Sequence, residues 1–272
     1  MTLRRNSLLA HHELITTLAW KSVVVRYKQA YLGLAWTVAK PAMMMAIFTV
    51  MRSFIGIDSG NVPYPVMAYC ALIPWMFFQG SAAEGVNSVV GNAHLIKKVY
   101  FPREILPLTA VVTKLVELGI NLAIVLLLMA WYGILPGAQA LWVPLLVLYT
   151  VLVALTVALI GAAINVHFRD VGQMLPLLMS LAMYLSPVIY PLALVKQRLM
   201  TEGMAGEYGP WLYTLYTANP LAGIIDAFQR VLLANQPPDL QAMLPGLVLV
   251  AVCLPLSYLF FKRAESHFAD VI

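Results

Sequence analysis

Charged residues are scarce in this sequence. Only 11% of its 272 residues are charged and 61% are hydrophobic, whereas about a quarter of a soluble domain is charged. This composition excludes a large soluble module and predicts an integral membrane protein with one compact domain. We also expect no cleavable signal peptide, because the start MTLRRNSLLAHHE lacks the apolar region of about 7–15 residues and the small-residue cleavage site of such peptides.

Cysteines and catalytic motifs are also sparse. Cys70 and Cys253 lie in apolar runs, so we interpret them as small buried hydrophobes and not as a disulfide or metal pair. The sequence has no G-x-x-x-x-G-K-[ST] phosphate loop, no His/Cys/Asp/Glu set at metal spacing and no G-x-S-x-G nucleophile turn. We therefore predict no catalytic residue, metal site or cofactor on this chain. Uphill transport would draw on an ion gradient or on another chain.

Apolar runs of membrane-spanning length occur six times, at roughly residues 32–57, 66–90, 108–135, 141–166, 171–190 and 244–261. The predicted fold class is all-α integral membrane, with short outer-leaflet helices between residues 192 and 241. We divide the chain into an N-terminal cytoplasmic segment (1–31), a six-span domain (32–262) and a short cytoplasmic tail (263–272). The N-terminal segment is predicted to carry an amphipathic interface helix, although an extended start of the first span is an alternative.

The basic residues indicate the orientation. Six spans put both termini on one side, together with Arg4, Arg5, Lys21, Arg26, Lys28, Lys97, Lys98, Arg103, Arg169, Lys262 and Arg263, whereas only Lys196, Arg198 and Arg230 fall on the other side. This bias places both termini in the cytoplasm. The net charge of +5 is spread in flanks between apolar runs, which fits membrane orientation better than nucleic-acid binding.

One strongly charged stretch interrupts the apolar runs, at residues 92–107 (NAHLIKKVYFPREILP). Its charges would each cost several kcal/mol in hydrocarbon, so the stretch must lie outside the bilayer, on the cytoplasmic side. Apolar residues stand beside the charges, more of them than a solvated loop needs. We predict a short amphipathic helix that docks on a partner; a charged turn lying on the headgroups is the alternative.

Few ionisable residues fall inside the predicted spans. Lys40, just before Pro41, either lines a translocation path or snorkels to the headgroups. Lys114 and Glu117 are three residues apart, so they can pair on one helix face, which favours charge neutralisation over a proton relay. Glu84 and Glu117 are the only acidic candidates within spans, and no inverted repeat is evident. These features favour a partner chain over an ion gradient as the energy source.

The charged stretch, with its LIKKVYFPREILPL core, resembles the coupling-helix region of ABC transporter permeases of the transmembrane type 2 family. More closely, it resembles the branch that exports O-antigen, capsule or teichoic-acid-type polysaccharides. Further landmarks of that branch recur in matching order, from about residue 26 to residue 262: Arg26-Tyr27-Lys28 with Leu32-Gly33 and Trp36, Pro74-Trp75 with Phe77-Phe78, Phe168-Arg169-Asp170, Ser186-Pro187-Val188-Ile189-Tyr190, and Asn219-Pro220-Leu221.

The resemblance implies a homodimer in the bacterial inner membrane, bound to two copies of a separate ATPase subunit that holds ATP and Mg. It implies a lipid-linked polysaccharide as substrate, membrane lipid around the spans, and no nucleic-acid partner. In this family the charged stretch sits in a groove of the ATPase and transmits its closure. The coupling residues so assigned are Leu95, Ile96, Lys97, Lys98, Tyr100, Phe101, Pro102, Arg103, Glu104, Phe168, Arg169 and Asp170.

Aromatic residues are candidates for the polymer path, because sugar C–H faces stack on aromatic rings without fixing register. The aromatic candidates are Trp36, Trp75, Phe77, Phe78, Tyr184 and Tyr190, and the intramembrane Lys40 is a further candidate. Interface anchoring and packing between spans are the alternative roles of these aromatics. Two other functions stay open from the sequence: an exporter of the same class for a drug or small lipid, and a gradient-driven secondary transporter.

Overall fold

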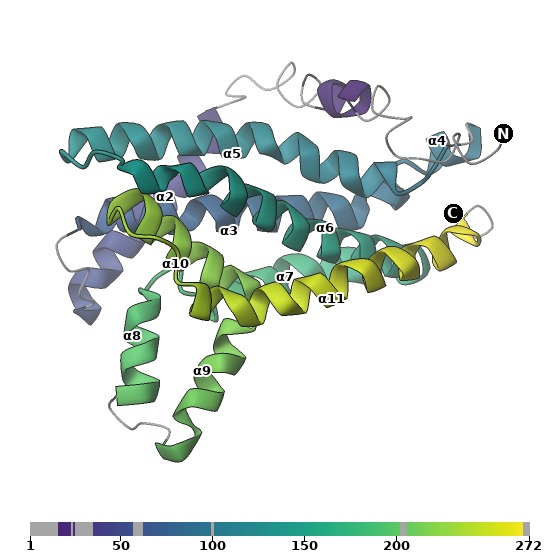
Figure 1. Ribbon diagram of the computed structural model, residues 1–272. Coiled ribbons are helices and arrows are strands. Elements are labelled where there is room, and N and C mark those ends of the chain that lie inside the picture. The colour runs from purple at the N-terminus through teal and green to yellow at the C-terminus, as the bar shows by residue number, and fades with distance from the viewer. Residues whose placement is uncertain are drawn as a thin grey trace.

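The computed structural model describes residues 16–22, 24, 35–56, 62–98, 101–201 and 206–268. Its regular elements in these ranges are all helical, with no strand among them, as the fold class predicts. Figure 1 shows a bundle of long helices from which α8 (Leu192–Lys196) and α9 (Gly209–Thr217) project. Most of the N-terminal segment, Val99, Tyr100 and the last four residues lie outside the described part.

The described part of the chain forms a succession of helices joined by turns and loops. In order they are α2 (Ala35–Ile55), α3 (Tyr64–Gly91), α4 (Ala93–Lys98), α5 (Ile105–Trp131), η2 (Ala138–Trp142), α6 (Val143–His167), α7 (Asp170–Tyr184), α8 (Leu192–Lys196), η3 (Gln197–Thr201), η4 (Gly206–Tyr208), α9 (Gly209–Thr217), α10 (Pro220–Leu233) and α11 (Leu240–Glu265). Residues 16–22 are also helical, within the predicted interface helix.

Four of the described helices are long and apolar enough to cross a membrane: residues 64–91, 105–131, 138–167 and 240–265. They correspond to the second, third, fourth and sixth predicted spans. The helices in the first and fifth predicted spans, α2 and α7, are not among these four. α2 has 21 residues but contains Lys40 and Arg52, and α7 has only 15, fewer than the roughly 20 that cross a bilayer as a straight helix.

The predicted fifth span does not run as one helix to residue 190. α7 ends at Tyr184, and the next residues form a buried turn before α8 begins at Leu192. Pro187 and Pro191 explain the break, because proline removes a helical N–H and restricts the residue before it. The Tyr64 hydroxyl donates to the Ile189 carbonyl oxygen at 2.6 Å, which fixes the turn against α3.

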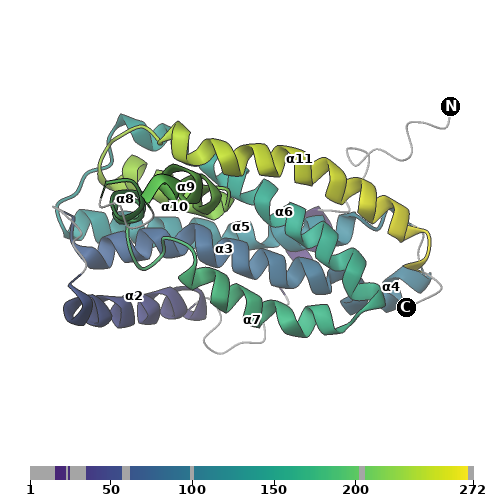
Figure 2. The ribbon, with the colours of Figure 1, turned by 90° about the horizontal axis from the view of Figure 1, so that it is seen from below.

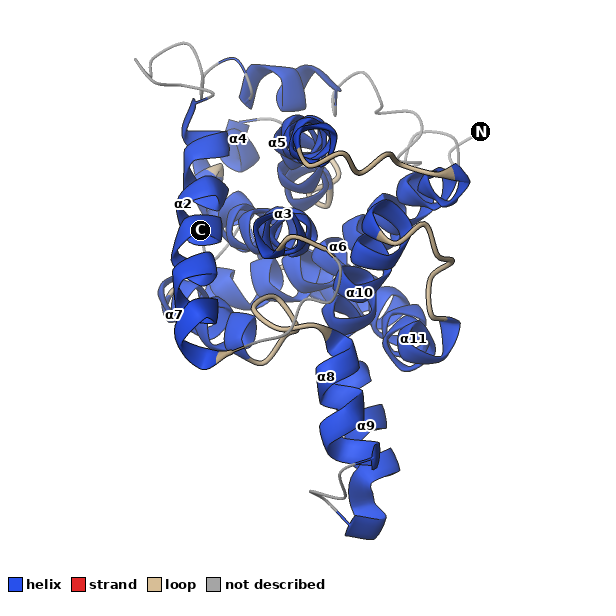
Figure 3. Cartoon of the chain, turned by 90° about the vertical axis from the view of Figure 1, so that its left-hand side faces the viewer, coloured by secondary structure: helices blue, strands red, loops and turns tan. Residues whose placement is uncertain are grey.

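α3 is the centre of the bundle, with α2, α5, α6, α7 and α10 packed around it (Figure 3). The first half of the helix is apolar on all sides and almost fully surrounded, and it buries Tyr69, Cys70 and Trp75. Its closest neighbour is α6: a Cβ at Gly85 would lie 2.4 Å from the Ala158 Cβ. Such small residues let two membrane helices approach closely.

Candidate functional site

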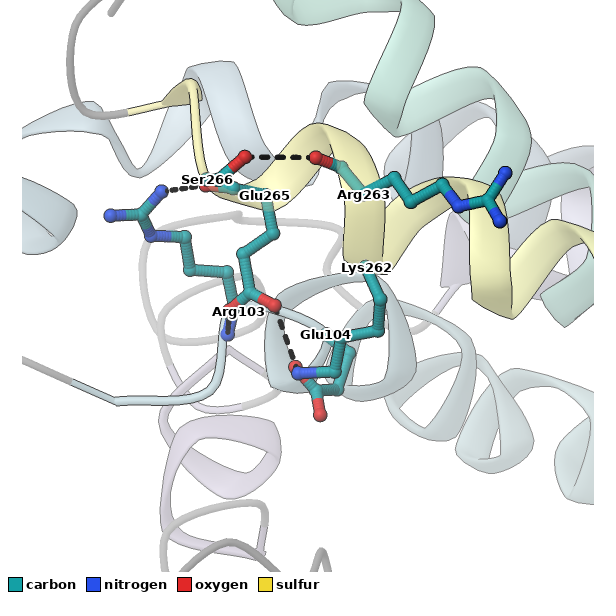
Figure 4. Close-up of polar contacts among 6 residues, drawn as sticks. All are labelled: Arg103, Glu104, Lys262, Arg263, Glu265 and Ser266. Carbon is teal, nitrogen blue, oxygen red and sulfur yellow. Dashed lines mark hydrogen bonds and ion pairs between the residues drawn. The ribbon is translucent and has the colours of Figure 1, made fainter.

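The charged stretch is held by the C-terminal end of α11. Glu104, which precedes α5, is 4% exposed, and its Oε2 lies 2.6 Å from the Lys262 Nζ. The same Nζ lies 2.8 Å from the Glu265 Oε2, one helical turn further along α11. Figure 4 shows this cluster. A buried carboxylate without a cation is strongly destabilising, so Lys262 stabilises the local fold at this point.

Arg103 completes the contact from the other side. Its backbone N–H donates to the Glu265 Oε1 at 3.0 Å, and its guanidinium donates to the Glu265 backbone carbonyl. A cation at the carbonyl end of α11 also complements the helix dipole. The guanidinium carbon lies 6.0 Å from the centre of the Phe268 ring, within cation–π range. We call Arg103, Glu104, Lys262, Glu265 and Phe268 the clamp.

An apolar cluster lies beneath the clamp. Phe101, which is 7% exposed, and Ile96 of α4 belong to it together with Phe261 and Phe268 of the C-terminal region. The last two rings meet edge to face at 5.4 Å. The cluster therefore joins the neighbouring segments α4 and the start of α5 to the end of α11, about 160 residues later in the sequence (Figure 2).

The structure separates the predicted coupling residues into two groups. Ile96, Phe101 and Glu104 are buried in this chain's own fold, in a region that the end of α11 helps to cover. The local sequence could not predict this burial, because the covering residues of α11 lie about 160 positions away. Leu95, Pro102 and Arg103 are partly exposed, and Tyr100 lies outside the described residues.

The exposed group is Lys97 and Lys98 on α4, with Phe168, Arg169 and Asp170 at the turn between α6 and α7. Both elements lie at the same end of the bundle (Figure 2). Asn165, which the sequence analysis missed, fixes that turn. Its Oδ1 accepts from the Gly172 N–H at 2.9 Å, and its Nδ2 donates to the Val86 carbonyl of α3 at 3.1 Å.

A polar cavity of about 870 Å³ lies between α2, α3 and α5. Three predicted path residues, Trp36, Lys40 and Phe77, line it. At its wall, the Lys114 Nζ lies 2.8 Å from the Glu84 Oε1 and 2.7 Å from the Glu117 Oε1. The predicted pairing of Lys114 with Glu117 is thus confirmed, and Glu84 of α3 joins it as a third member.

The other predicted path residues lie elsewhere. Trp75 and Phe78 line a separate, almost wholly apolar cavity of about 1030 Å³, bounded mainly by α6, α7, α9 and α11. Tyr184 is exposed at the end of α7, and the Tyr190 hydroxyl donates to its carbonyl at 3.1 Å. Within one chain, the seven predicted path residues therefore do not form a single surface.

Two motifs that are separate in the sequence, Ser186–Tyr190 and Asn219–Leu221, meet in space. Asn219 begins α10, and its Oδ1 accepts from the Leu221 N–H at 3.1 Å, which is an N-cap. Its Nδ2 donates to the Ser186 hydroxyl at 2.8 Å. The Ser186–Tyr190 and Asn219–Leu221 motifs are thus two halves of one contact.

A comparison with protein families decides the class of this chain. The family model described as ABC-2 type transporter matches residues 13–233, most of the sequence. The chain belongs to the ABC-2 type transporter family. The matched region includes α4, the clamp residues Arg103 and Glu104, and the turn between α6 and α7, all of which contain residues predicted to couple to the ATPase.

Curated relatives of this ABC-2 chain carry one name. An O-antigen export system permease protein RfbA from Myxococcus xanthus is 26% identical over 266 residues, covering 97% of each chain. Two proteins of the same name from Klebsiella pneumoniae are 27% and 24% identical, covering 96% of this chain and 95% of their own length. The chain is thus similar to these permeases along nearly its whole length.

Proposed function

We propose that the chain is the membrane permease subunit of an ATP-driven exporter, which moves a lipid-linked polysaccharide from the cytoplasm to the outer side of the bacterial inner membrane. The family and the names of its full-length relatives support this proposal. The observation that carries the mechanism is the pair of exposed lysines on α4, held at one end of the bundle by the clamp, in a sequence without a phosphate loop.

The partner in this mechanism is a separate ATPase subunit that binds ATP and Mg. Lys97 and Lys98 project from α4 as an exposed cationic pair, which suits a docking groove with acidic residues. Phe168 offers an exposed apolar contact at the neighbouring turn. The clamp ties the segment that follows α4 to the end of α11, and Ile96 packs α4 into the same apolar cluster, so a push on α4 would be passed to the ends of α5 and α11.

We further propose that α2, and α7 with the buried turn that follows it to residue 190, cross the membrane with the four long helices. This gives six spans and puts both termini in the cytoplasm. A second copy of the chain would complete the translocation path. Exposed apolar side chains along α7, including Leu177, Leu178 and Leu181, support burial of this face by lipid or by that copy.

Charge reversal on α4 tests the coupling. Lys97→Glu with Lys98→Glu should abolish co-purification of the ATPase with the tagged permease, while the permease still inserts in the membrane. Lys196→Glu on the projecting helix α8 is the control and should keep the ATPase bound. Full ATPase recovery with the α4 variant would contradict the proposal. Phe101→Asp is a weaker test, because Phe101 is buried in the chain's own fold.

Transport measurements separate the proposal from a gradient-driven carrier. Membrane vesicles containing permease and ATPase should translocate polymer only when ATP is supplied. Transport that persists with an ion gradient and without ATP would identify a secondary transporter instead.

A further inference from the structure

The polar cavity stands out because its charged side chains lie inside the predicted spans. Glu84 is seven residues before the end of α3 and Lys114 nine residues after the start of α5, which places both roughly 10–14 Å in from the α4 end of the bundle. Ionisable groups at such depth are costly and usually serve a transport path. We propose that this cavity binds uncharged sugar units of the exported polymer, an inference that rests on the proposed function.

The cavity wall is fixed by a hydrogen-bonded network. Lys114 holds both Glu84 and Glu117 through its ammonium group. Asn121 donates to the Glu117 carbonyl at 2.8 Å and accepts from the Tyr69 hydroxyl at 2.8 Å. Carboxylate and amide groups held in this way offer preorganised partners to ligand hydroxyls, which lowers the ordering cost of binding.

Gly80 makes room for the network. A Cβ at this position would lie 3.2 Å from the Lys114 Cε, so the lysine stem passes directly over the α3 backbone. The ammonium group thereby reaches Glu84 on the same helix. The cavity is therefore built jointly by α3 and α5, and α2 adds the exposed side chains of Trp36 and Lys40 to its lining.

The charge of the cavity indicates which ligand fits. Among the described residues that line it, the ionisable ones are Lys40, Lys114, Glu84 and Glu117, so the formal charges cancel. A diphosphate headgroup would meet as much negative as positive charge and would gain little. A neutral polyol can instead donate hydroxyl protons to the carboxylates and accept from Gln79 and Lys40.

Trp36 supplies the apolar half of a sugar site. It is 50% exposed and belongs to the cavity lining, as does the ring of Phe77. A flat indole beside carboxylate and amide groups matches a sugar ring, which has an apolar C–H face and a polar edge. The larger apolar cavity lacks this combination, because its lining holds no charged side chain among the described residues.

Photo-cross-linking in polymer-producing cells tests the site. Trp36 is replaced by the photoreactive amino acid p-benzoylphenylalanine, and the matched control is the same replacement of Trp131, which is 86% exposed on α5 outside the cavity. After irradiation, the tagged chain is purified under denaturing conditions and stained for carbohydrate. We expect glycan bound to the chain from position 36, at least tenfold above the signal from position 131.

A second position keeps the test decisive. If replacement of Trp36 prevents assembly with the ATPase, the same amino acid is placed at Gln79, another lining residue. Glycan from either cavity position supports the site. Absence of glycan at both, or equal labelling at position 131, in cells that still display the polymer overturns the site while leaving the exporter function standing. Cells whose surface polymer does not depend on this chain would instead overturn the proposed function.

Discussion

At the scale of single residues, the clamp depends on one cation. Lys262 neutralises the buried Glu104, so Lys262→Met should leave that carboxylate without a partner. We expect a loss of about 2–3 kcal/mol in unfolding free energy, below the range for a fully buried pair because Lys262 is partly exposed. Thermal unfolding of the detergent-purified chain measures this effect.

Two variants control for this effect. Arg263→Gln removes the adjacent, exposed charge and should change stability by less than about 0.5 kcal/mol. The double variant Glu104→Gln with Lys262→Met removes both partners, so it should be more stable than Lys262→Met alone. Equal melting temperatures for Lys262→Met and Arg263→Gln would show that the clamp contributes nothing.

A second residue-scale prediction concerns Asp226 of α10. Burial raises the pKa of its carboxyl from 3.8 to about 6, with Arg230 opposing and Asp239 adding to the rise. Between about pH 4 and 6 the folded chain keeps a proton that the unfolded chain has lost, so stability falls as pH rises through this window.

Asp226→Asn should remove that dependence. The variant should be more stable than the wild type above pH 6, by at most about 3 kcal/mol, and the two should converge near pH 4. Unfolding curves at pH 4, 5, 6 and 7.5 measure the difference. A constant offset between the two proteins at all pH values would contradict this account.

At the scale of elements, the close approach of α3 and α6 gives the third prediction. Gly85→Ala would place a methyl group 2.4 Å from the Ala158 Cβ and 3.2 Å from its Cα, so the helices must move apart. We expect a loss of about 1–3 kcal/mol. Gly119→Ala in α5 is the control, because nothing lies within 4 Å of its Cβ position and alanine favours a helix.

Thermal unfolding of Gly85→Ala and Gly119→Ala measures both stability changes. Gly119→Ala should match or exceed the wild type, with a gain of at most about 1 kcal/mol. If Gly85→Ala is as stable as Gly119→Ala, the packing of α3 against α6 is looser than described.

The long elements were predictable because their signal is local. α3, α5, α6 and α11 each come from an apolar run of spanning length, and the charged stretch between α3 and α5 was identified from its own residues. The fifth span was predicted to reach residue 190, and its helix α7 ends six residues earlier, at Tyr184, before Pro187 and Pro191. The clamp was missed because Arg103 and Glu265 lie 162 positions apart. Their pairing depends on tertiary packing, which periodicity does not encode.

At the scale of the whole molecule, α11 connects the two ends of the bundle. Its last turn holds the clamp, and its first turns pack against α9 and α10. A Cβ at Gly246 would lie 2.6 Å from the Pro220 Cα, so this outer contact is also close. A displacement at the clamp can therefore reach the projecting α9 through one continuous helix (Figure 1).

This route predicts that the clamp and the α4 lysines have different roles. The double variant Glu104→Gln with Lys262→Met should still bind the ATPase, because Lys97 and Lys98 remain exposed, but polymer export should fall by about tenfold or more. Export and co-purification are measured on the same strain. Normal export by this variant would exclude the clamp from transmission.

The central claim is that a nucleotide-hydrolysing partner binds this chain at α4. The direct measurement is photo-cross-linking in native membranes from p-benzoylphenylalanine in place of Lys98, with the same amino acid in place of Lys196 as control. We predict an adduct between the permease and an ATPase subunit from position 98 and none from position 196. An adduct from position 196 alone, or none from position 98 in cells that export polymer, would contradict the account.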